Sequence, residues 1–302
     1  MTSFRENMRG VVTLTACNLL FLINDTLNKI ASADLPLGEI IFVRGLFATA
    51  LLVPLVRLGG AHRHASLLLN GGIVLRVVAE VFGAFLYLFA LFRMPIANTN
   101  TIVQIVPLMV TGAGALFFAE AVGWRRWTAI AVGFVGVLIV VRPGLSGFNG
   151  FSLLVLAAAF CITLRDVTTR IIPSGLPAPL VALVTGITVG AFGPLFSIGA
   201  GETWVMPAAG DLALLAAAAC FLVGGYLTAV SFMRHGDISV VAPFRYTVII
   251  FAILVGFIVW REVPDWPMLA GTAVIAAAGI YTFSRERNLA RLAEEVAAGE
   301  GL

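Results

Sequence analysis

Apolar residues follow one another along the chain in blocks of about 20, the length at which an α-helix crosses a hydrocarbon core about 30 Å thick. Segments of about ten residues that alternate apolar and polar side chains, as in a membrane β-barrel, do not recur. The pattern therefore predicts an all-α integral membrane protein with ten transmembrane helices. The expected spans are residues 9–30, 36–58, 71–93, 95–119, 125–142, 150–171, 177–199, 211–234, 238–261 and 266–284.

Composition supports the same class. Hydrophobic residues make up 60% of the chain and charged residues 12%, against about 25% charged residues in ordinary soluble domains. The mean hydropathy is +1.02. The longest connections between spans, residues 59–70 and 200–210, are too short for a separate enzyme or binding module.

The basic residues predict the orientation, because cytoplasmic loops retain Lys and Arg. With the N-terminus inside, the cytoplasmic side holds Arg5, Arg9, Arg57, Arg63, Arg125, Arg126, Arg170, Arg234, Arg285, Arg287 and Arg291, and the outer side only Lys29, Arg93, Arg142 and Arg261. We expect both termini in the cytoplasm. The first span runs into Asn24-Asp25 rather than a cleavage site, so it is expected to be retained. Orientation explains the net charge of +3, so no nucleic-acid partner is expected.

Cysteine and histidine fall where neither metal binding nor catalysis is expected. Cys17, Cys161 and Cys220 lie inside spans without CxxC spacing, and they are predicted to be small packing residues. His62, His64 and His235 lie in or beside loops, and no HExxH or GxSxG motif occurs. We therefore expect no metal, no cofactor and no enzymatic activity.

The end of the first span is repeated later in the chain. Residues 23–36, INDTLNKIASADLP, align without a gap to residues 164–177, LRDVTTRIIPSGLP. The alignment places Asp166 on Asp25 and Arg170 on Lys29. Glu-x-x-x-Trp begins at Glu120 and again at Glu262, 142 residues later. Tyr-Leu-x-Ala likewise begins at residues 87 and 226.

These matches predict a tandem duplication of five spans, with repeats over residues 1–145 and 146–285 and a cytoplasmic tail over 286–302. An odd number of spans inverts the second repeat in the membrane. Inverted repeats are typical of alternating-access transporters, whose substrate site lies near the midplane. The sequence therefore predicts a carrier.

Asp25 and Asp166 lie near opposite ends of spans one and six, where an ionisable side chain costs at least about 2.5 to 3.5 kcal/mol. One interpretation pairs each aspartate with the base one helical turn on, Lys29 or Arg170.

The alternative interpretation uses depth in the membrane. Asp25 with Arg44, and Asp166 with Arg245, would form an outer and an inner latch that close in alternate states. Because Arg44 aligns with Thr185, the two pairs are not equivalent in the repeats.

Glu80 lies near the middle of span three and shares a helix face with Gly83 and Tyr87. This face has a carboxylate, a gap and a phenol, as expected of a cavity wall. Glu80 is thus a candidate substrate or proton site, and an Arg76–Glu80 structural pair is the alternative.

Span four begins PIANTNTIVQIVP, which places Asn100 and Gln104 on one polar stripe that is costly against lipid and useful against a polar solute. Tyr226 and Tyr246 lie at midplane depth, where aromatic walls suit a flat or amphipathic molecule. Packing, and kinks at Pro107 and Pro243, are the structural alternatives. The candidate substrate-binding residues are Glu80, Tyr87, Asn100, Gln104, Tyr226 and Tyr246.

Small residues let transmembrane helices approach closely. Gly186-x-x-x-Gly190 with Gly193, and Gly133-x-x-Gly136, are therefore predicted helix contacts.

The two inverted halves, each ending in an apolar residue and Glu-x-x-x-Trp before a Gly-rich span, resemble the EamA-type members of the drug/metabolite transporter superfamily. The resemblance covers about residues 9–284 and is nearest to bacterial exporters of amino acids and related metabolites, aromatic amino acid exporters included. It implies a central cavity lined by spans one, three, four, six, eight and nine. Arg44, in span two, departs from that implied lining.

We thus expect a secondary transporter that exports small amphipathic metabolites, such as neutral or aromatic amino acids, across a bacterial plasma membrane. A single subunit embedded in the bilayer is the expected working unit. The alternatives are an exporter of cationic or aromatic drugs and, in a different class, a channel, although no ring of filter residues is found.

Overall fold

The computed structural model describes residues 4–61, 63–64, 68, 70–118, 123–145, 148–169, 171–172, 176–232 and 241–299. Within these residues every regular element is helical. The elements are α1 (Phe4–Ala31), α2 (Leu37–Leu58), α3 (Gly71–Leu91), α4 (Ile96–Val103), α5 (Val106–Phe117), α6 (Trp124–Val141), α7 (Phe151–Thr169), α8 (Ala178–Ala200), α9 (Ala209–Phe232), the 3₁₀ helix η2 (Ala242–Tyr246), α11 (Thr247–Trp260) and α12 (Trp266–Gly299).

The ends and breaks of the helices follow local sequence. Asn70 caps α3, because its side-chain oxygen accepts a hydrogen bond from the Gly72 amide at 2.8 Å. Gly201, with a φ of 66°, ends α8 in the left-handed conformation that glycine adopts without strain. Pro107 cannot donate to the carbonyl of Val103, and the fourth predicted span is divided there into α4 and α5.

Nine helical stretches of the described residues are long and apolar enough to cross a membrane, which confirms an all-α protein of the multi-pass class. Each corresponds to one of the first nine predicted spans. The tenth predicted span corresponds to the start of α12, whose apolar part, Trp266–Thr282, is shorter. Its crossing of the membrane stays a prediction.

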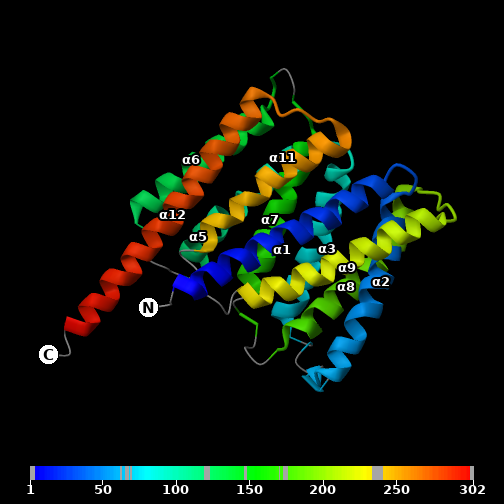
Figure 1. Ribbon diagram of the computed structural model, residues 1–302, viewed down its shortest axis with the longest axis horizontal. Coiled ribbons are helices and arrows are strands. Elements are labelled where there is room, and N and C mark those ends of the chain that lie inside the picture. Colours follow the sequence, from blue (N-terminus) through cyan, green and yellow to red (C-terminus); the bar gives the residue numbers. More distant parts are fainter. Residues whose placement is uncertain are drawn as a thin grey trace.

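Helices from the two halves of the chain pack together in pairs. The extensive contacts join α1 to α9, α2 to α8, α3 to α7 and α6 to α12, and α4 packs against α11. Figure 1 shows α6 and α12 side by side at one edge of the bundle, and α1 begins on the side of the bundle where α12 ends. We call the opposite face, where α1 and α11 end and α12 begins, the predicted outer face.

The α2–α8 pair depends on glycine. A Cβ atom at Gly45 would lie 2.8 Å from the Cα atom of Gly190, and one at Gly193 would overlap the carbonyl oxygen of Gly38. The predicted contact is therefore confirmed at Gly190 and Gly193. At Gly186 an added Cβ atom would meet no atom within 4 Å, so glycine is not needed there, although the carbonyl oxygen of Gly186 would lie 3.6 Å from a Cβ atom added at Gly45.

The α6–α12 pair is close in the same way. A Cβ atom at Gly136 would lie 3.1 Å from the carbonyl oxygen of Gly271 on α12, and one at Gly133 would overlap the side chain of Leu108 on α5. Both glycines of the second predicted contact therefore face neighbouring helices. Beyond the bundle α12 continues to Gly299, so the backbone of most of the predicted cytoplasmic tail prolongs this helix (Figure 1).

Replacing Gly193 by alanine is expected to lower the free energy of unfolding by about 1–3 kcal/mol, since the new methyl group forces the two backbones apart. Gly186→Ala is the matched control, because that site has space and alanine favours a helix over glycine by about 1 kcal/mol. Thermal unfolding in detergent should show a lower midpoint for Gly193→Ala only. Equal midpoints for both variants would contradict the close α2–α8 contact.

Candidate functional site

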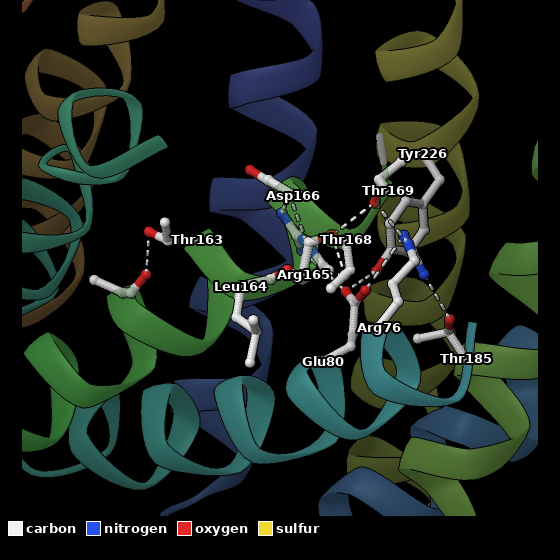
Figure 2. A network of polar contacts seen from close by, with 11 residues as sticks. Arg76, Glu80, Thr163, Leu164, Arg165, Asp166, Thr168, Thr169, Thr185 and Tyr226 are labelled. Carbon is white, nitrogen blue, oxygen red and sulfur yellow. Dashed lines mark hydrogen bonds and ion pairs between the residues drawn. The ribbon is translucent and has the colours of Figure 1, made fainter. Parts of the chain in front are cut away.

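Five side chains from α3, α7 and α9 form a charged network inside the bundle (Figure 2). We name it the Glu80 cluster; its members are Arg76, Glu80, Arg165, Asp166 and Tyr226. Glu80 Oε1 accepts hydrogen bonds from Arg165 Nη1 at 3.0 Å and from the Tyr226 hydroxyl at 3.2 Å. Arg76 Nη2 lies 3.5 Å from Glu80 Oε2, and Arg165 Nη2 lies 2.8 Å from Asp166 Oδ1. Two carboxylates are thus balanced by two guanidinium groups.

Close packing of α3 on α7 brings the Glu80 cluster together. Gly83 lies one turn from Glu80, and a Cβ atom there would be 3.3 Å from Cys161 Cβ on α7. Gly83 is therefore a helix contact, which corrects the expected gap in a cavity wall. Arg76 also donates to Thr169 at 3.1 Å and to Thr185 at 3.2 Å, which ties the cluster to α8.

A second network lies nearer the predicted outer face, and we name it the Asp25 cluster: Asn24, Asp25, Arg44 and Tyr87. The Tyr87 hydroxyl donates to Asp25 Oδ2 at 2.6 Å, and Asn24 Nδ2 donates to Asp25 Oδ1 at 3.0 Å. Arg44 Nη1 donates to Asn24 Oδ1 at 3.4 Å. Asp25 and Tyr87 are half-buried, whereas Asn24 and Arg44 are buried.

The charge pairs expected for Asp25 and Asp166 are replaced by others among the described residues, whereas the alternative expected for Glu80, a pair with Arg76, is formed. Lys29 extends past Asp25 to Glu262, and Asp166 binds its chain neighbour Arg165. Neither latch pair, Asp25–Arg44 nor Asp166–Arg245, forms a salt bridge there. The reason is local: Asn24 stands between Asp25 and Arg44, and Arg165 is within direct reach of Asp166. Arg170, the other expected partner, lies outside the described residues.

Lys29 and Glu262 form a charge pair at the predicted outer face. Lys29 Nζ donates to Glu262 Oε1 at 2.9 Å and to the carbonyl of Met94 at 2.8 Å, and it lies 4.7 Å from the ring centre of Trp260. Glu262 Oε2 accepts from the Ile96 amide at 3.0 Å. The pair thus joins the end of α1 to the α3–α4 and α11–α12 connections.

Sequence reasoning missed this pair, although Glu262 stands in the repeated Glu-x-x-x-Trp motif. The first copy of the motif has Glu120, which lies outside the described residues. A second bond between the halves at this face joins Arg142 to Asp265, whose side chain is 54% exposed. The hydrogen bond from Arg142 holds the pKa of Asp265 below its usual range, so this pair persists at neutral pH and weakens as the pH falls.

Two predicted substrate-binding residues, Gln104 and Asn100, donate to backbone carbonyls. Gln104 Nε2 donates at 3.0 Å to the carbonyl of Arg245, which lies within the 3₁₀ segment η2, and Asn18 donates to the same carbonyl at 3.2 Å. These amides satisfy backbone oxygens at a break in the helix, as membrane burial requires. Asn100 donates to the carbonyl of Ile96, four residues back in α4, at 3.1 Å.

Tyr246 faces α12, away from both clusters. Its side chain is 6% exposed, and its hydroxyl packs where a Cβ atom of Gly279 would stand. The predicted site residues therefore separate by location. Glu80 and Tyr226 meet in one cluster, Asp25 and Tyr87 in the other, and Arg44 joins the second from span two, outside the lining that the resemblance implies.

The described residues contain no group of three or more His, Cys, Asp or Glu side chains that could hold a metal ion. The three cysteines are free thiols. What the two clusters offer chemically is charge and hydrogen bonding at membrane depth. They provide acceptors for a cation, donors for an anion, and phenol rings beside both.

Comparison with known proteins gives consistent relatives over most of the chain. Residues 8–142 match the model of the EamA-like transporter family. The chain is 26% identical to the riboflavin transporter of Vibrio cholerae over 94% of its own length and 98% of that protein. It is 26% identical to the S-adenosylmethionine uptake transporter of Rickettsia bellii, over 87% and 89%. It is 27% identical to the pseudopaline exporter CntI of Pseudomonas aeruginosa, over 90% and 94%.

A solved structure, described as a crystal structure of a protein, has the same fold. It superposes with a TM-score of 0.62 at 19% identity, over 93% of this chain and 99% of the other.

Proposed function

Because the chain is a member of the drug/metabolite transporter superfamily, with an EamA-like segment over residues 8–142, we propose that it exports neutral or aromatic amino acids by alternating access. It is a multi-pass membrane protein and a small-molecule transporter. The proposal adds the substrate class, the direction and a bacterial plasma membrane with both termini in the cytoplasm.

We further propose ten spans in two inverted repeats, over residues 1–145 and 146–285. The helix pairs support this arrangement, since α1–α9 and α3–α7 become equivalent when the repeats are exchanged. The pairs α2–α8, α4–α11 and α6–α12 each join a span to its own equivalent. A two-fold axis in the membrane plane produces such a set.

One observation carries the substrate class: charged and phenolic side chains meet inside the bundle in two clusters, one from the first half of the chain and one from both halves, and several of these side chains keep partial exposure. Arg165 is 24% and Asp166 32% exposed, and Tyr87 and Tyr226 are half-buried. An amino acid has an ammonium group that a carboxylate can bind, a carboxylate that a guanidinium group can bind, and a side chain that can pack against a phenol ring. Relatives named for S-adenosylmethionine and pseudopaline support an amino-acid-like solute, and the second supports export.

Counterflow in liposomes tests the proposal. Vesicles that contain the purified protein and unlabelled phenylalanine should accumulate labelled phenylalanine from outside, and empty vesicles should not. A panel of neutral amino acids at one pH gives the specificity. No uptake above that of empty vesicles for any of them would overturn the substrate class.

An exporter of cationic or aromatic drugs is the second candidate. The half-buried carboxylate of Asp25, bound by Tyr87, favours it, because a cation is stabilised by a carboxylate and by aromatic faces. The same vesicles loaded with a quaternary ammonium dye separate the two. Counterflow of the dye without counterflow of amino acids would support this candidate.

A further inference from the structure

Asp25 and Arg44 carry opposite charges, yet each contacts the neutral amide of Asn24. Asn24 Nδ2 donates to Asp25 at 3.0 Å, and Asn24 Oδ1 accepts from Arg44 at 3.4 Å. No ion pair involving either charge is formed by the residues that the structure describes. One amide thus bridges two charges that lie inside the bundle.

Both charges are incompletely satisfied. The hydrogen bonds to Asp25 come from two neutral groups, the Tyr87 hydroxyl and the Asn24 amide. The Nε atom of Arg44 is buried without a hydrogen-bond partner, and the whole side chain is 7% exposed. A buried donor without a partner costs free energy, and a charge in a membrane costs more. Such an arrangement is stabilised when a ligand supplies the missing opposite charges.

The Glu80 cluster differs in this respect. Glu80 has Arg165 at 3.0 Å and Arg76 at 3.5 Å, and Asp166 has Arg165 at 2.8 Å. Its charges are already paired with one another. A solute would have to break these ion pairs before it could bind there.

We infer that the Asp25 cluster is a zwitterion site: the ammonium group of the solute binds Asp25, its carboxylate binds Arg44, and Asn24 is displaced from between them. This assignment rests on the proposed export of amino acids and specifies where the α-amino and α-carboxylate groups bind. Tyr87 donates a hydrogen bond to Asp25 and so positions the Asp25 carboxylate, and its ring faces the ammonium group of the solute. Arginine suits the solute carboxylate because its guanidinium plane can donate two parallel hydrogen bonds.

Three probes that share a phenyl ring separate binding at Asp25 from binding at Arg44. L-Phenylalanine carries both charges, phenethylamine only the ammonium group and 3-phenylpropanoate only the carboxylate. Their binding is measured by calorimetry on the purified protein in detergent, at one pH near neutrality. Phenylalanine is expected to bind most tightly to the wild type.

Each variant should then lose affinity only for the probes that carry the group bound at the substituted residue. Asp25→Asn should weaken phenylalanine and phenethylamine by about 10- to 100-fold, the range of a hydrogen bond to a charged group, and leave 3-phenylpropanoate unchanged. Arg44→Gln should weaken phenylalanine and 3-phenylpropanoate by a similar factor and leave phenethylamine unchanged. Arg44→Lys, which keeps the charge but not the paired donors, should lie between Arg44→Gln and wild type.

Asp265→Asn is the control, because Asp265 lies at the predicted outer face outside both clusters, and asparagine can still accept from the Met268 amide. It should leave all three affinities within about twofold of wild type. The inference is overturned if each variant weakens the three probes equally, or if Asp265→Asn gives the pattern expected of Asp25→Asn. Selective loss remains interpretable for a variant with a lowered unfolding midpoint, because a folding defect lowers the affinities for all three probes together.

Failure of the proposed function looks different. A wild type that shows no amino-acid counterflow in liposomes would overturn export of amino acids, whatever the calorimetry shows. The crossed pattern would still support a zwitterion site for another solute with both charges. Normal counterflow with no selective loss in Asp25→Asn or Arg44→Gln would overturn the site and leave the export proposal standing.

Discussion

Glu80→Gln is expected to lower the free energy of unfolding by about 3–5 kcal/mol, the range found when one partner of a buried ion pair is removed. Glutamine keeps an acceptor for the Tyr226 hydroxyl but leaves one uncompensated guanidinium charge in the cluster. The rate of counterflow should fall together with the free energy of unfolding. Thermal unfolding in detergent and counterflow in liposomes measure the two effects.

The double variant Glu80→Gln/Arg76→Gln tests whether the uncompensated guanidinium charge causes the loss of stability. It restores a neutral cluster and leaves the Arg165–Asp166 pair intact, so most of the lost stability should return. Tyr226→Phe is the control, since it removes one hydrogen bond and keeps the ring, at a cost of about 1 kcal/mol. A Glu80→Gln variant that unfolds at the wild-type temperature would show that the ion pairs of Glu80 contribute no net stability to the folded protein.

Glu262→Gln is expected to open the predicted outer face. The carboxylate binds both the ammonium group of Lys29 and the Ile96 amide, so its loss weakens two hydrogen bonds at once. Hydrogen exchange at the Ile96 amide should accelerate about tenfold or more, because a hydrogen bond to a charged group contributes about 1.5–3 kcal/mol. Mass spectrometry of the peptide that covers residues 93–99 measures this rate.

Asp265→Asn is the matched control at the same face. Its pair with Arg142 is exposed, and asparagine can still accept from the Met268 amide. Charge reversal, Lys29→Glu with Glu262→Lys, should not rescue the face. A glutamate at 29 would meet the Met94 carbonyl, and a lysine at 262 would meet the Ile96 amide. Full rescue would contradict the role of these backbone contacts.

The Lys29–Glu262 pair is a candidate for a contact that closes the predicted outer face. The sequence predicted latches from Asp25 with Arg44 and Asp166 with Arg245, on depth in the membrane alone. Lys29 and Glu262 instead connect α1 to both neighbouring connections at the predicted outer face. In an alternating-access carrier, contacts at one face must separate before a solute leaves there. Hydrogen exchange at the Ile96 amide, expected to be faster in Glu262→Gln, tests whether the Lys29–Glu262 pair holds this face closed.

The sequence by itself determined the class of this protein and the positions of its long apolar helices. Length and hydropathy are local properties, and a membrane leaves a chain of this composition little choice but helices. Close contacts at Gly190, Gly193, Gly133 and Gly136 could also be predicted, because small residues at helical spacing specify a packed face. The resemblance in the Glu-x-x-x-Trp motifs indicated the superfamily.

Only the tertiary structure decided which charges meet. Lys29 reaches Glu262, far along the chain, and Glu80 reaches Arg165, because helices from different halves cross there. Tyr246 turned toward Gly279 and Gln104 toward a backbone carbonyl, although their spacing fitted a cavity wall equally well. Helical periodicity defines a face but not its neighbour. The partner of an intramembrane charge depends on which helices pack, and no local pattern contains that choice.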